Sequence, residues 1–221
     1  MKTIILFLLP IFLFSSTLIK KYETGETFEF KEKDMIEEIK KTIEVLRNGG
    51  VILYPTDTIW GLGCDATNPD AVQKVYEIKK RAETKSMLVL VDSPAKLPAY
   101  VDEIPDMACD LIELTNKPLT IVYPGAKNLA SNLISADKTI GIRVTSEAFS
   151  KKLCEMFRKP SVSTSANISG EKSPAFFSEI TDEVKNAVDY IVNIRQDDTT
   201  PANASSIIKL GIGNQIEIIR Q

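Results

Sequence analysis

Residues 49–91 read GGVILYPTDTIWGLGCDATNPDAVQKVYEIKKRAETKSMLVLV, and the fold prediction starts from this stretch. Val51–Tyr54 is a short apolar run between two glycines and a proline, which predicts a strand buried on both faces. Asn68 and Pro69 predict the start of a helix, with an N-cap residue followed by proline at the first helical position. Met87–Val91 is a second apolar run. The stretch therefore predicts a strand, a helix and a further strand of one α/β sheet.

Polar side chains follow the first predicted strand directly. Thr56, Asp57 and Thr58 place two hydroxyls and a carboxylate at its carboxyl end. Open α/β sheets bind ligands at the carboxyl ends of their strands, so this segment is a candidate binding site. Gly61 and Gly63 come next and predict a tight turn of the backbone.

Cations gather where the predicted helix ends. Lys79, Lys80 and Arg81 lie in its last turn, Lys85 follows, and Glu83 is the one acidic residue among them. Such a cluster beside a strand suggests a polyanionic ligand. A second interpretation stays open, in which these cations merely complement the dipole at the C-terminal end of the helix.

The rest of the chain alternates strands with helices. This alternation predicts an α/β fold with a mixed sheet, closed by an antiparallel hairpin at its end. Hydrophobic periodicity and turn residues predict helices over 34–46, 106–115, 149–157 and 181–188, a short helix from 93, and strands over 119–123, 139–144, 161–164, 190–194, 206–210 and 216–219.

Composition excludes several classes of protein and of catalytic site. The 221 residues are 43% hydrophobic and 26% charged with a net charge of −3, which is ordinary for a globular domain and gives no global attraction to nucleic acid. The chain has no histidine, so it lacks the commonest general base and every Ser/His or Cys/His arrangement. Its three cysteines lack metal-ligand spacing. An enzyme of this composition works by positioning and charge.

The N-terminal segment 1–17 resembles a secretory signal. Lys2 precedes the mostly apolar run Ile4–Phe14, which is too short to span a membrane. Either the protein is exported or translation begins near Leu18. We favour the second interpretation because the cysteines look reduced, and therefore expect a single domain over 18–221 and a cytoplasmic location.

Two further segments carry candidate ligand-binding residues. Ser165 and Asn167 follow the strand predicted at 161–164, as a second polar strand exit. They either donate to a phosphate or carboxylate or form an ordinary turn. Arg143 points away from its apolar neighbours on the strand 139–144, as a ligand clamp or as a solvated edge residue.

Together these motifs resemble the YrdC-like domain of threonylcarbamoyl-AMP synthases, in family order over roughly 36–220. That family implies a twisted open α/β sheet flanked by helices, with a concave cationic cleft. The motifs are YPTDTIWGLG at Tyr54–Gly63, IKKR at Ile78–Arg81, TIGIR at Thr139–Arg143, STSANISG at Ser163–Gly170 and ASSIIKL at Ala204–Leu210.

The resemblance implies a set of phosphate-binding residues. Lys79, Arg81, Ser165 and Asn167 match the family's Lys-Arg-Ser-Asn tetrad around the ATP phosphates, which makes them the candidate catalytic residues. Lys85 is a further candidate for ATP binding because it continues the same cationic cluster.

Other positions match the remainder of the family's site. Ser173 and Ser206 match polar positions near the nucleotide. Thr58 and Arg143 match positions near L-threonine, with the arginine paired to its carboxylate, and Thr56 lies beside them as a further candidate for threonine binding.

The activity implied by the resemblance is the synthesis of threonylcarbamoyl-AMP and pyrophosphate from L-threonine, bicarbonate and ATP. Magnesium would be held by the phosphates and water rather than by the protein. A transferase partner would pass the threonylcarbamoyl group to an adenosine beside the tRNA anticodon. Two alternatives stay open: a YciO-like paralogue with little synthase activity, and a factor that binds double-stranded RNA or tRNA through a local cationic face.

Overall fold

The computed structural model describes residues 25–82, 87–211 and 215–221. It divides into two compact units, Met1–Ile36 and Glu37–Gln221. The described part of the first unit is the beginning of helix α2 (Gly25–Arg47). The segment 1–17, the expected start at Leu18 and the candidate Lys85 lie outside the described residues, so these three expectations stay predictions.

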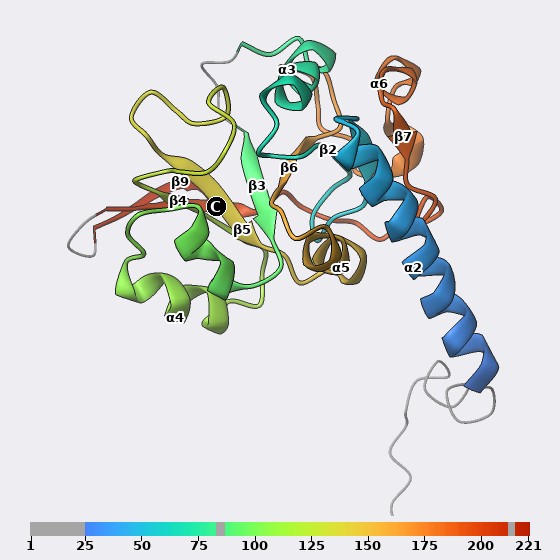
Figure 1. Cartoon of the computed structure of the whole chain (residues 1–221), viewed down its shortest axis with the longest axis horizontal. Coiled ribbons are helices and arrows are strands. Elements are labelled where there is room, and N and C mark those ends of the chain that lie inside the picture. Colours follow the sequence, from blue (N-terminus) through green and yellow to red (C-terminus); the bar gives the residue numbers. More distant parts are fainter. Residues whose placement is uncertain (1–24, 83–86, 212–214) are drawn as a thin grey trace, which may run out of the picture. The chain divides into compact units, whose positions relative to one another are not determined.

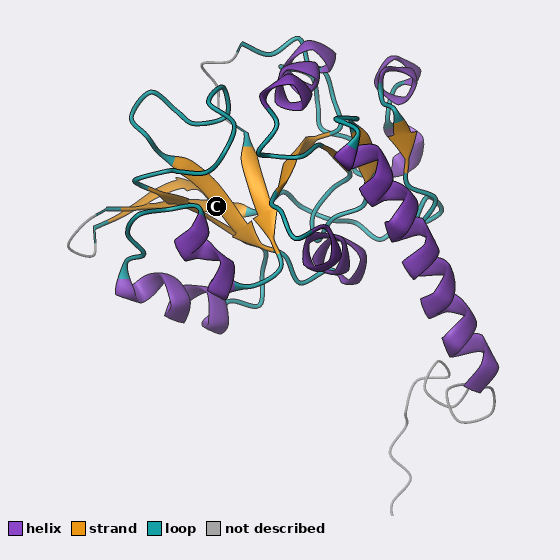
Figure 2. Cartoon of the chain, viewed as in Figure 1, coloured by secondary structure: helices purple, strands orange, loops and turns teal. Residues whose placement is uncertain are grey.

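Within the described residues, nine strands form one mixed sheet in the order β7-β1-β2-β6-β3-β5-β4-β8-β9, drawn in orange in Figure 2. The pairs β1–β7, β3–β5 and β4–β8 are parallel and the others antiparallel. This confirms the predicted α/β class and the closing hairpin. The strands are β1 (Ile52–Tyr54), β2 (Gly61–Gly63), β3 (Leu88–Val91), β4 (Leu119–Tyr123), β5 (Ile140–Val144), β6 (Ser161–Ser165), β7 (Tyr190–Ile191), β8 (Ser206–Leu210) and β9 (Ile216–Arg220).

Most helices begin and end close to the predicted positions (Figure 1), but α2 begins at Gly25 rather than at the predicted residue 34. Asn68 caps α3 as expected, because its Oδ1 accepts hydrogen bonds from the backbone N–H groups of Asp70 and Ala71 at 3.0 and 3.2 Å. A search of the described residues finds no helix with the length and apolar character needed to span a membrane. The helical segments are α2 (Gly25–Arg47), α3 (Pro69–Ile78), η1 (Pro94–Ala99), α4 (Asp106–Leu114), α5 (Ala148–Phe157), η2 (Phe177–Glu179) and α6 (Asp182–Ala187).

The main hydrophobic core lies on one face of the sheet. Val89 and Val91 of β3 belong to the same buried cluster as Val72 of α3 and Ala108 of α4. Leu90 alternates with them and faces the opposite side, where it is also buried. Burial of these apolar side chains against the helices forms the main core on one face of the sheet. Part of the other face lines a cavity.

Strand β2 corrects the prediction of a tight turn at Gly61 and Gly63. The two glycines instead form a strand between β1 and β6. A Cβ atom on Gly63 would lie 2.6 Å from Cε1 of Tyr54 and 2.8 Å from the carbonyl oxygen of Val162, so this position has no room for a side chain. Glycine thus serves close strand packing here rather than chain reversal.

The direction of β2 also brings two strand exits together. It pairs antiparallel with both β1 and β6, so these two strands run in the same direction. Their polar exits, which begin at Thr56 and end at Asn167, therefore leave the sheet at the same end. The two segments that the sequence identified separately belong to one region of the molecule.

Candidate active site

A cavity of about 330 Å³ lies on the sheet face opposite the main core. Strands β3, β4, β5, β6 and β8 contribute to its floor, and the segment after β1 and the end of β9 contribute to its walls. Its lining is rich in hydroxyl and guanidinium groups. The residues that carry these groups are Thr58, Arg81, Thr120, Ser135, Thr139, Arg143, Ser163, Thr164, Ser165, Ser173, Ser205 and Arg220.

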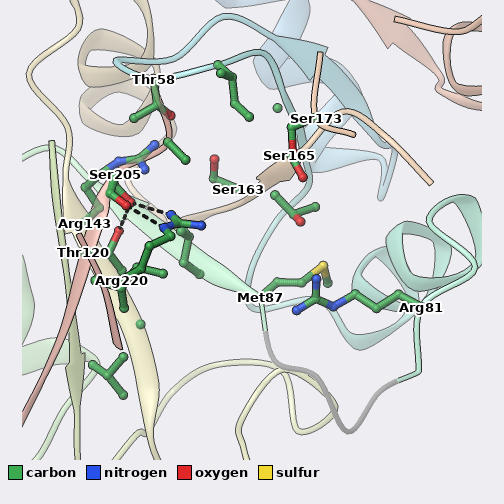
Figure 3. Close-up of a pocket in the computed structure, with 18 of the residues that line it drawn as sticks. Thr58, Arg81, Met87, Thr120, Arg143, Ser163, Ser165, Ser173, Ser205 and Arg220 are labelled. Atoms are coloured by element: carbon green, nitrogen blue, oxygen red, sulfur yellow. Dashed lines mark hydrogen bonds between the residues drawn. The ribbon is translucent and has the colours of Figure 1, made fainter. Parts of the chain in front are cut away.

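The arginines of the cavity lie at different ends of it. Figure 3 shows Arg81 at one end, beside Met87, and Arg143 and Arg220 together at the other. Ser163 and Ser165 lie between the two ends. The lining residues include no aspartate or glutamate among those that the structure describes. This arrangement suits an elongated ligand with negative charge at two places.

Lys79 organises the strand exit beneath this cavity. Its Nζ donates to the backbone carbonyl oxygens of Ser165 at 2.6 Å and Asn167 at 2.7 Å, and lies 3.3 Å from Asn167 Oδ1. The Ser165 hydroxyl donates to the same Oδ1 at 2.5 Å, and Asn167 Nδ2 donates to the carbonyl of Glu171 at 2.7 Å. Three members of the predicted tetrad are thus brought together in one hydrogen-bond network.

The ammonium of Lys79 does not face the cavity. Lys79 is only 2% exposed and, like Asn167, is absent from the lining, whereas Ser165 and Arg81 belong to it. Burial, assisted by the positive charge of Arg81, lowers the pKa of Lys79 to about 8. Lys79 therefore supports the strand exit, and Arg81 is the cation of this motif that reaches the cavity.

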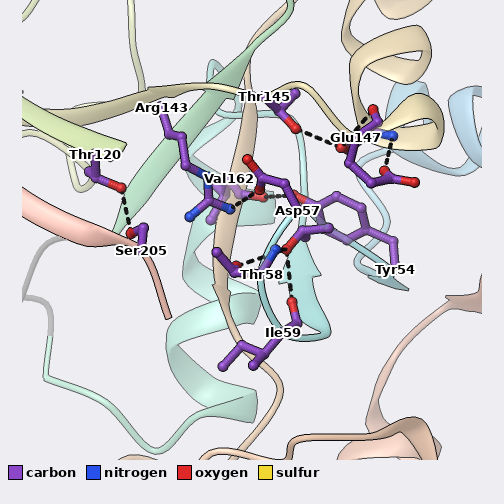
Figure 4. A network of polar contacts seen from close by, with 12 residues as sticks. Tyr54, Asp57, Thr58, Ile59, Thr120, Arg143, Thr145, Glu147, Val162 and Ser205 are labelled. Carbon is purple, nitrogen blue, oxygen red and sulfur yellow. Dashed lines mark hydrogen bonds and ion pairs between the residues drawn. The ribbon is translucent and has the colours of Figure 1, made fainter. Parts of the chain in front are cut away.

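Arg143 forms a buried ion pair with Asp57 at the other end. Arg143 Nη2 lies 2.9 Å from Asp57 Oδ1, and the two side chains are 3% and 6% exposed (Figure 4). Burial raises the pKa of the Asp57 carboxyl, and the charge of Arg143 opposes this shift. Arg143 is thus buried and lines the cavity, which excludes the interpretation of a solvated edge residue.

Local contacts hold the segment that carries Asp57. Thr56 Oγ1 accepts a hydrogen bond from the backbone N–H of Thr58 at 3.1 Å and donates to the carbonyl of Ile59 at 2.8 Å. Arg195 Nη1 donates to the carbonyl of Thr56 at 3.2 Å. Thr56 thus caps backbone groups, and Thr58 is the threonine of this segment that lines the cavity.

The nucleotide candidates Ser173 and Ser206 have different positions. Ser173 lines the cavity, whereas Ser206 lies outside its lining, and the preceding residue Ser205 takes that place. The Ser205 hydroxyl lies 2.8 Å from Thr120 Oγ1 and accepts from Arg220 Nη2 at 3.3 Å. Side chains alternate between the faces of a strand, so the neighbouring serine points away from the cavity.

Sequence reasoning missed Thr120, Ser163, Ser205 and Arg220 as lining residues. Ser205 had a usable signal, because it directly precedes β8 and lies two residues before Ile207, which also lines the cavity. Arg220 had none, since it reaches the cavity only through the pairing of β8 with β9. Within the described residues, no group of three or more His, Cys, Asp or Glu side chains could hold a metal ion.

Comparison with known sequences identifies related proteins. A family model described as Sua5/YciO/YrdC, telomere recombination, matches residues 44–221. The threonylcarbamoyl-AMP synthase of Pseudoalteromonas translucida is 38% identical over 158 residues, which cover 70% of this chain and 84% of that protein. The threonylcarbamoyl-AMP synthase of Vibrio campbellii is 31% identical over 180 residues, which cover 80% and 96%.

Solved structures share the fold. P. abyssi Sua5 complexed with L-threonine is 25% identical with a TM-score of 0.70, and the match covers 78% of this chain and 50% of that one. E. coli YciO is 26% identical with a TM-score of 0.72, and the match covers 83% and 88%. The chain thus spans about half the length of the P. abyssi protein and most of E. coli YciO.

Proposed function

Because the chain belongs to the Sua5/YciO/YrdC family, we propose that it makes threonylcarbamoyl-AMP and pyrophosphate from L-threonine, bicarbonate and ATP. Relatives that it covers over 84% and 96% of their length are named threonylcarbamoyl-AMP synthase. The observation that carries the proposal is the placement of guanidinium groups at both ends of one cavity, with serine hydroxyls between them. The reaction brings together a triphosphate, an amino-acid carboxylate and bicarbonate, and the first two match the two ends of the cavity.

The proposed site divides into a phosphate end and a threonine end. Arg81, Ser165 and Ser173 would bind the ATP phosphates. Ser205, which lines the cavity in place of the candidate Ser206, lies at the other end beside Arg220 and would contact the nucleotide outside its phosphates. Their support is that all four line the cavity. Lys79 and Asn167 would act beneath the phosphate end by fixing the backbone around Ser165. Lys85 stays a prediction for this end.

The threonine end would consist of Thr58 and Arg143. Arg143 would pair with the carboxylate of L-threonine, and the Thr58 hydroxyl would lie beside the substrate. Thr56 would contribute indirectly, by holding the backbone of Thr58. The threonine-complexed structure of a protein with 25% identity supports a threonine site in this fold.

The proposed chemistry needs no histidine. The threonine nitrogen bonds to the carbon of bicarbonate and water leaves, which gives a carbamate. An oxygen of this carbamate then bonds to the α-phosphorus of ATP while the bond to pyrophosphate breaks. Charge develops on the phosphate oxygens, where preorganised donors lower the barrier most effectively. Alignment of the two reactants in one cavity supplies the remainder. Arg81 is the donor that we place on the leaving phosphates.

Magnesium would accompany ATP through the phosphates and water. The described lining of the cavity contains hydroxyl and guanidinium groups but no carboxylate, so these residues offer the ion no strong protein ligand. The ion would supply charge neutralisation on the triphosphate when bound. We further propose a cytoplasmic location, a transferase partner that delivers the threonylcarbamoyl group to tRNA, and tRNA as the final acceptor.

Pyrophosphate release tests the proposal directly. The purified full-length chain is incubated with ATP, magnesium, labelled bicarbonate and L-threonine, and the adenylate is identified by mass spectrometry. We expect pyrophosphate and label in the adenylate only when threonine and bicarbonate are both present. Pyrophosphate release that does not depend on threonine would contradict the proposal, and would leave a nucleotide-binding paralogue as the alternative.

A further inference from the structure

Asp57 is a buried carboxylate next to the guanidinium group at the threonine end. Arg143 Nη2 lies 2.9 Å from Asp57 Oδ1, whereas Arg143 Nε has no hydrogen-bond partner among the described residues. The pair thus leaves donor capacity on the guanidinium group for a ligand. A fully satisfied pair would have used that capacity within the protein.

The Asp57 carboxylate is held in place rather than free to turn away. Thr56 ties the preceding backbone to Thr58 and Ile59, and Arg195 Nη1 donates to the Thr56 carbonyl at 3.2 Å. Figure 4 shows Asp57 between Arg143 and Tyr54. The negative charge therefore stays beside Arg143 while a ligand enters or leaves.

A second acidic group that acts on Asp57, Glu147, already has partners among the described residues. Glu147 caps α5 by accepting hydrogen bonds from the backbone N–H groups of Phe149 and Ser150 at 3.1 and 2.7 Å. Its Oε1 also lies 3.4 Å from Arg195 Nη1. Asp57 is thus the carboxylate that balances Arg143.

We propose that Asp57 determines which anions the threonine end accepts. The Arg143–Asp57 pair has no net charge, and Arg220 adds one positive charge at the same end, so this end of the cavity matches a carboxylate monoanion. A phosphate dianion carries one more negative charge than a carboxylate and is repelled more strongly by Asp57, which lies next to Arg143 but outside the cavity lining. Because of this pair, the threonine end binds the amino acid in preference to phosphate, and the polyphosphate binds at the end that contains Arg81. This inference rests on the proposed function and assigns Asp57 a role in specificity that acts through Arg143.

Replacement by asparagine tests the role of the charge. Asp57→Asn keeps the shape of the side chain and removes its negative charge, so Arg143 becomes an uncompensated cation that attracts inorganic phosphate. Threonine binding is measured by calorimetry with and without one fixed concentration of inorganic phosphate. We expect phosphate to weaken the apparent threonine affinity of Asp57→Asn at least about tenfold, on the scale of one charge contact, and that of the wild type less than twofold. Equal sensitivity of the two proteins would overturn the proposal.

A matched control separates charge selectivity from loss of a buried ion pair. Asp65 is a second buried carboxylate, paired with Lys159 at 2.6 Å, and lies outside the cavity lining. Asp65→Asn therefore loses an ion pair without exposing a guanidinium group to the ligand. We expect its threonine affinity to respond to phosphate as the wild type does, and a tenfold response in this control would contradict the proposed mechanism.

A measurement on the wild type keeps the proposal falsifiable if Asp57→Asn does not fold. The phosphonate analogue of threonine carries a dianion in place of the carboxylate. We expect it to bind the wild type at least about tenfold more weakly than threonine at a pH where it is doubly charged. Equal affinities would overturn the role of Asp57. Absence of threonine binding together with absence of pyrophosphate release would instead reject the proposed function, and this inference with it.

Discussion

Replacing Lys79 by methionine removes the ammonium that holds the strand exit and keeps the apolar length of the side chain. Lys79 Nζ contacts the carbonyl oxygens of Ser165 and Asn167 at 2.6 and 2.7 Å, and Lys79 itself is 2% exposed. Methionine would fill the space but donate nothing. We expect a large loss of activity with a small loss of stability.

Two opposing terms determine the small change in stability. Each of the two carbonyls left without a partner costs about 1–3 kcal/mol, so the loss is roughly 4 kcal/mol. Burial lowers the pKa of Lys79 from 10.5 to about 8, which corresponds to about 3 kcal/mol of unfavourable charge burial that methionine removes. The difference is about 1 kcal/mol of destabilisation, small beside the ~5–15 kcal/mol of a typical domain.

The loss of activity follows from position rather than stability. Without the ammonium, the backbone of Ser165 is no longer drawn toward Asn167, and a shift of about 1 Å in a catalytic donor costs about 10²-fold in rate. Threonine-dependent pyrophosphate release measures kcat. Urea unfolding measures the midpoint, which is the urea concentration at which half of the protein is unfolded. We expect kcat to fall about 10²-fold while the midpoint moves slightly.

Lys80→Met is the matched control. Lys80 is the adjacent residue, and its Nζ pairs with Glu183 at 2.7 Å on the surface, where both side chains are more than half exposed. We expect this variant to keep the activity and unfolding midpoint of the wild type. Wild-type kcat in Lys79→Met, or an equal loss in Lys80→Met, would refute the reasoning.

Three further predictions concern other parts of the site. Arg81→Ala should lower kcat at least about 10²-fold with an unchanged unfolding midpoint, because it removes one donor to the developing charge; a wild-type rate would exclude that role. The stability of the wild type relative to Lys79→Met should rise with pH between about 8 and 10.5, because the folded chain has released the Lys79 proton in this window while the unfolded chain still binds it; urea midpoints of both proteins across this range test the sign. Ser205→Ala should raise the KM for ATP several-fold while Ser206→Ala leaves it unchanged, and the reverse order would show that the nucleotide contacts the other face of β8.

The sequence predicted most elements of the sheet because their signals are local. The apolar run before Pro55 became the fully buried strand β1, and Asn68 became the N-cap of α3. Strand β2 was missed for the opposite reason. Its three residues are Gly61, Leu62 and Gly63, and the need for glycine comes from Tyr54 and Val162 on the neighbouring strands. The local sequence of Gly61–Gly63 does not predict such contacts between strands.

The candidate site was predictable by region but less so by side chain. The two polar strand exits converge because β1 and β6 run in the same direction, which a sequence pattern alone does not specify. Ser206 was one position away from the residue that lines the cavity, since a shift of one residue moves a side chain to the other face of a strand. Asp57 was visible as a carboxylate at a strand exit, but its pairing with Arg143 depends on a contact across 86 positions in sequence.

The end of α3 explains why Lys79 and Arg81 have different roles although they lie two residues apart. Lys80 adopts a left-handed conformation with φ of 48°. The backbone N–H of Lys80 donates to the carbonyl of Glu77 and that of Arg81 donates to Tyr76, both at 3.0 Å, which is the Schellman pattern of a helix end. The chain reverses at this residue, so Lys79 stays on the buried side of the helix end and Arg81 is turned toward the cavity. The reversal directs Lys79 into the protein and Arg81 to the cavity, and the interpretation of these cations as a simple complement to the helix dipole does not explain this difference.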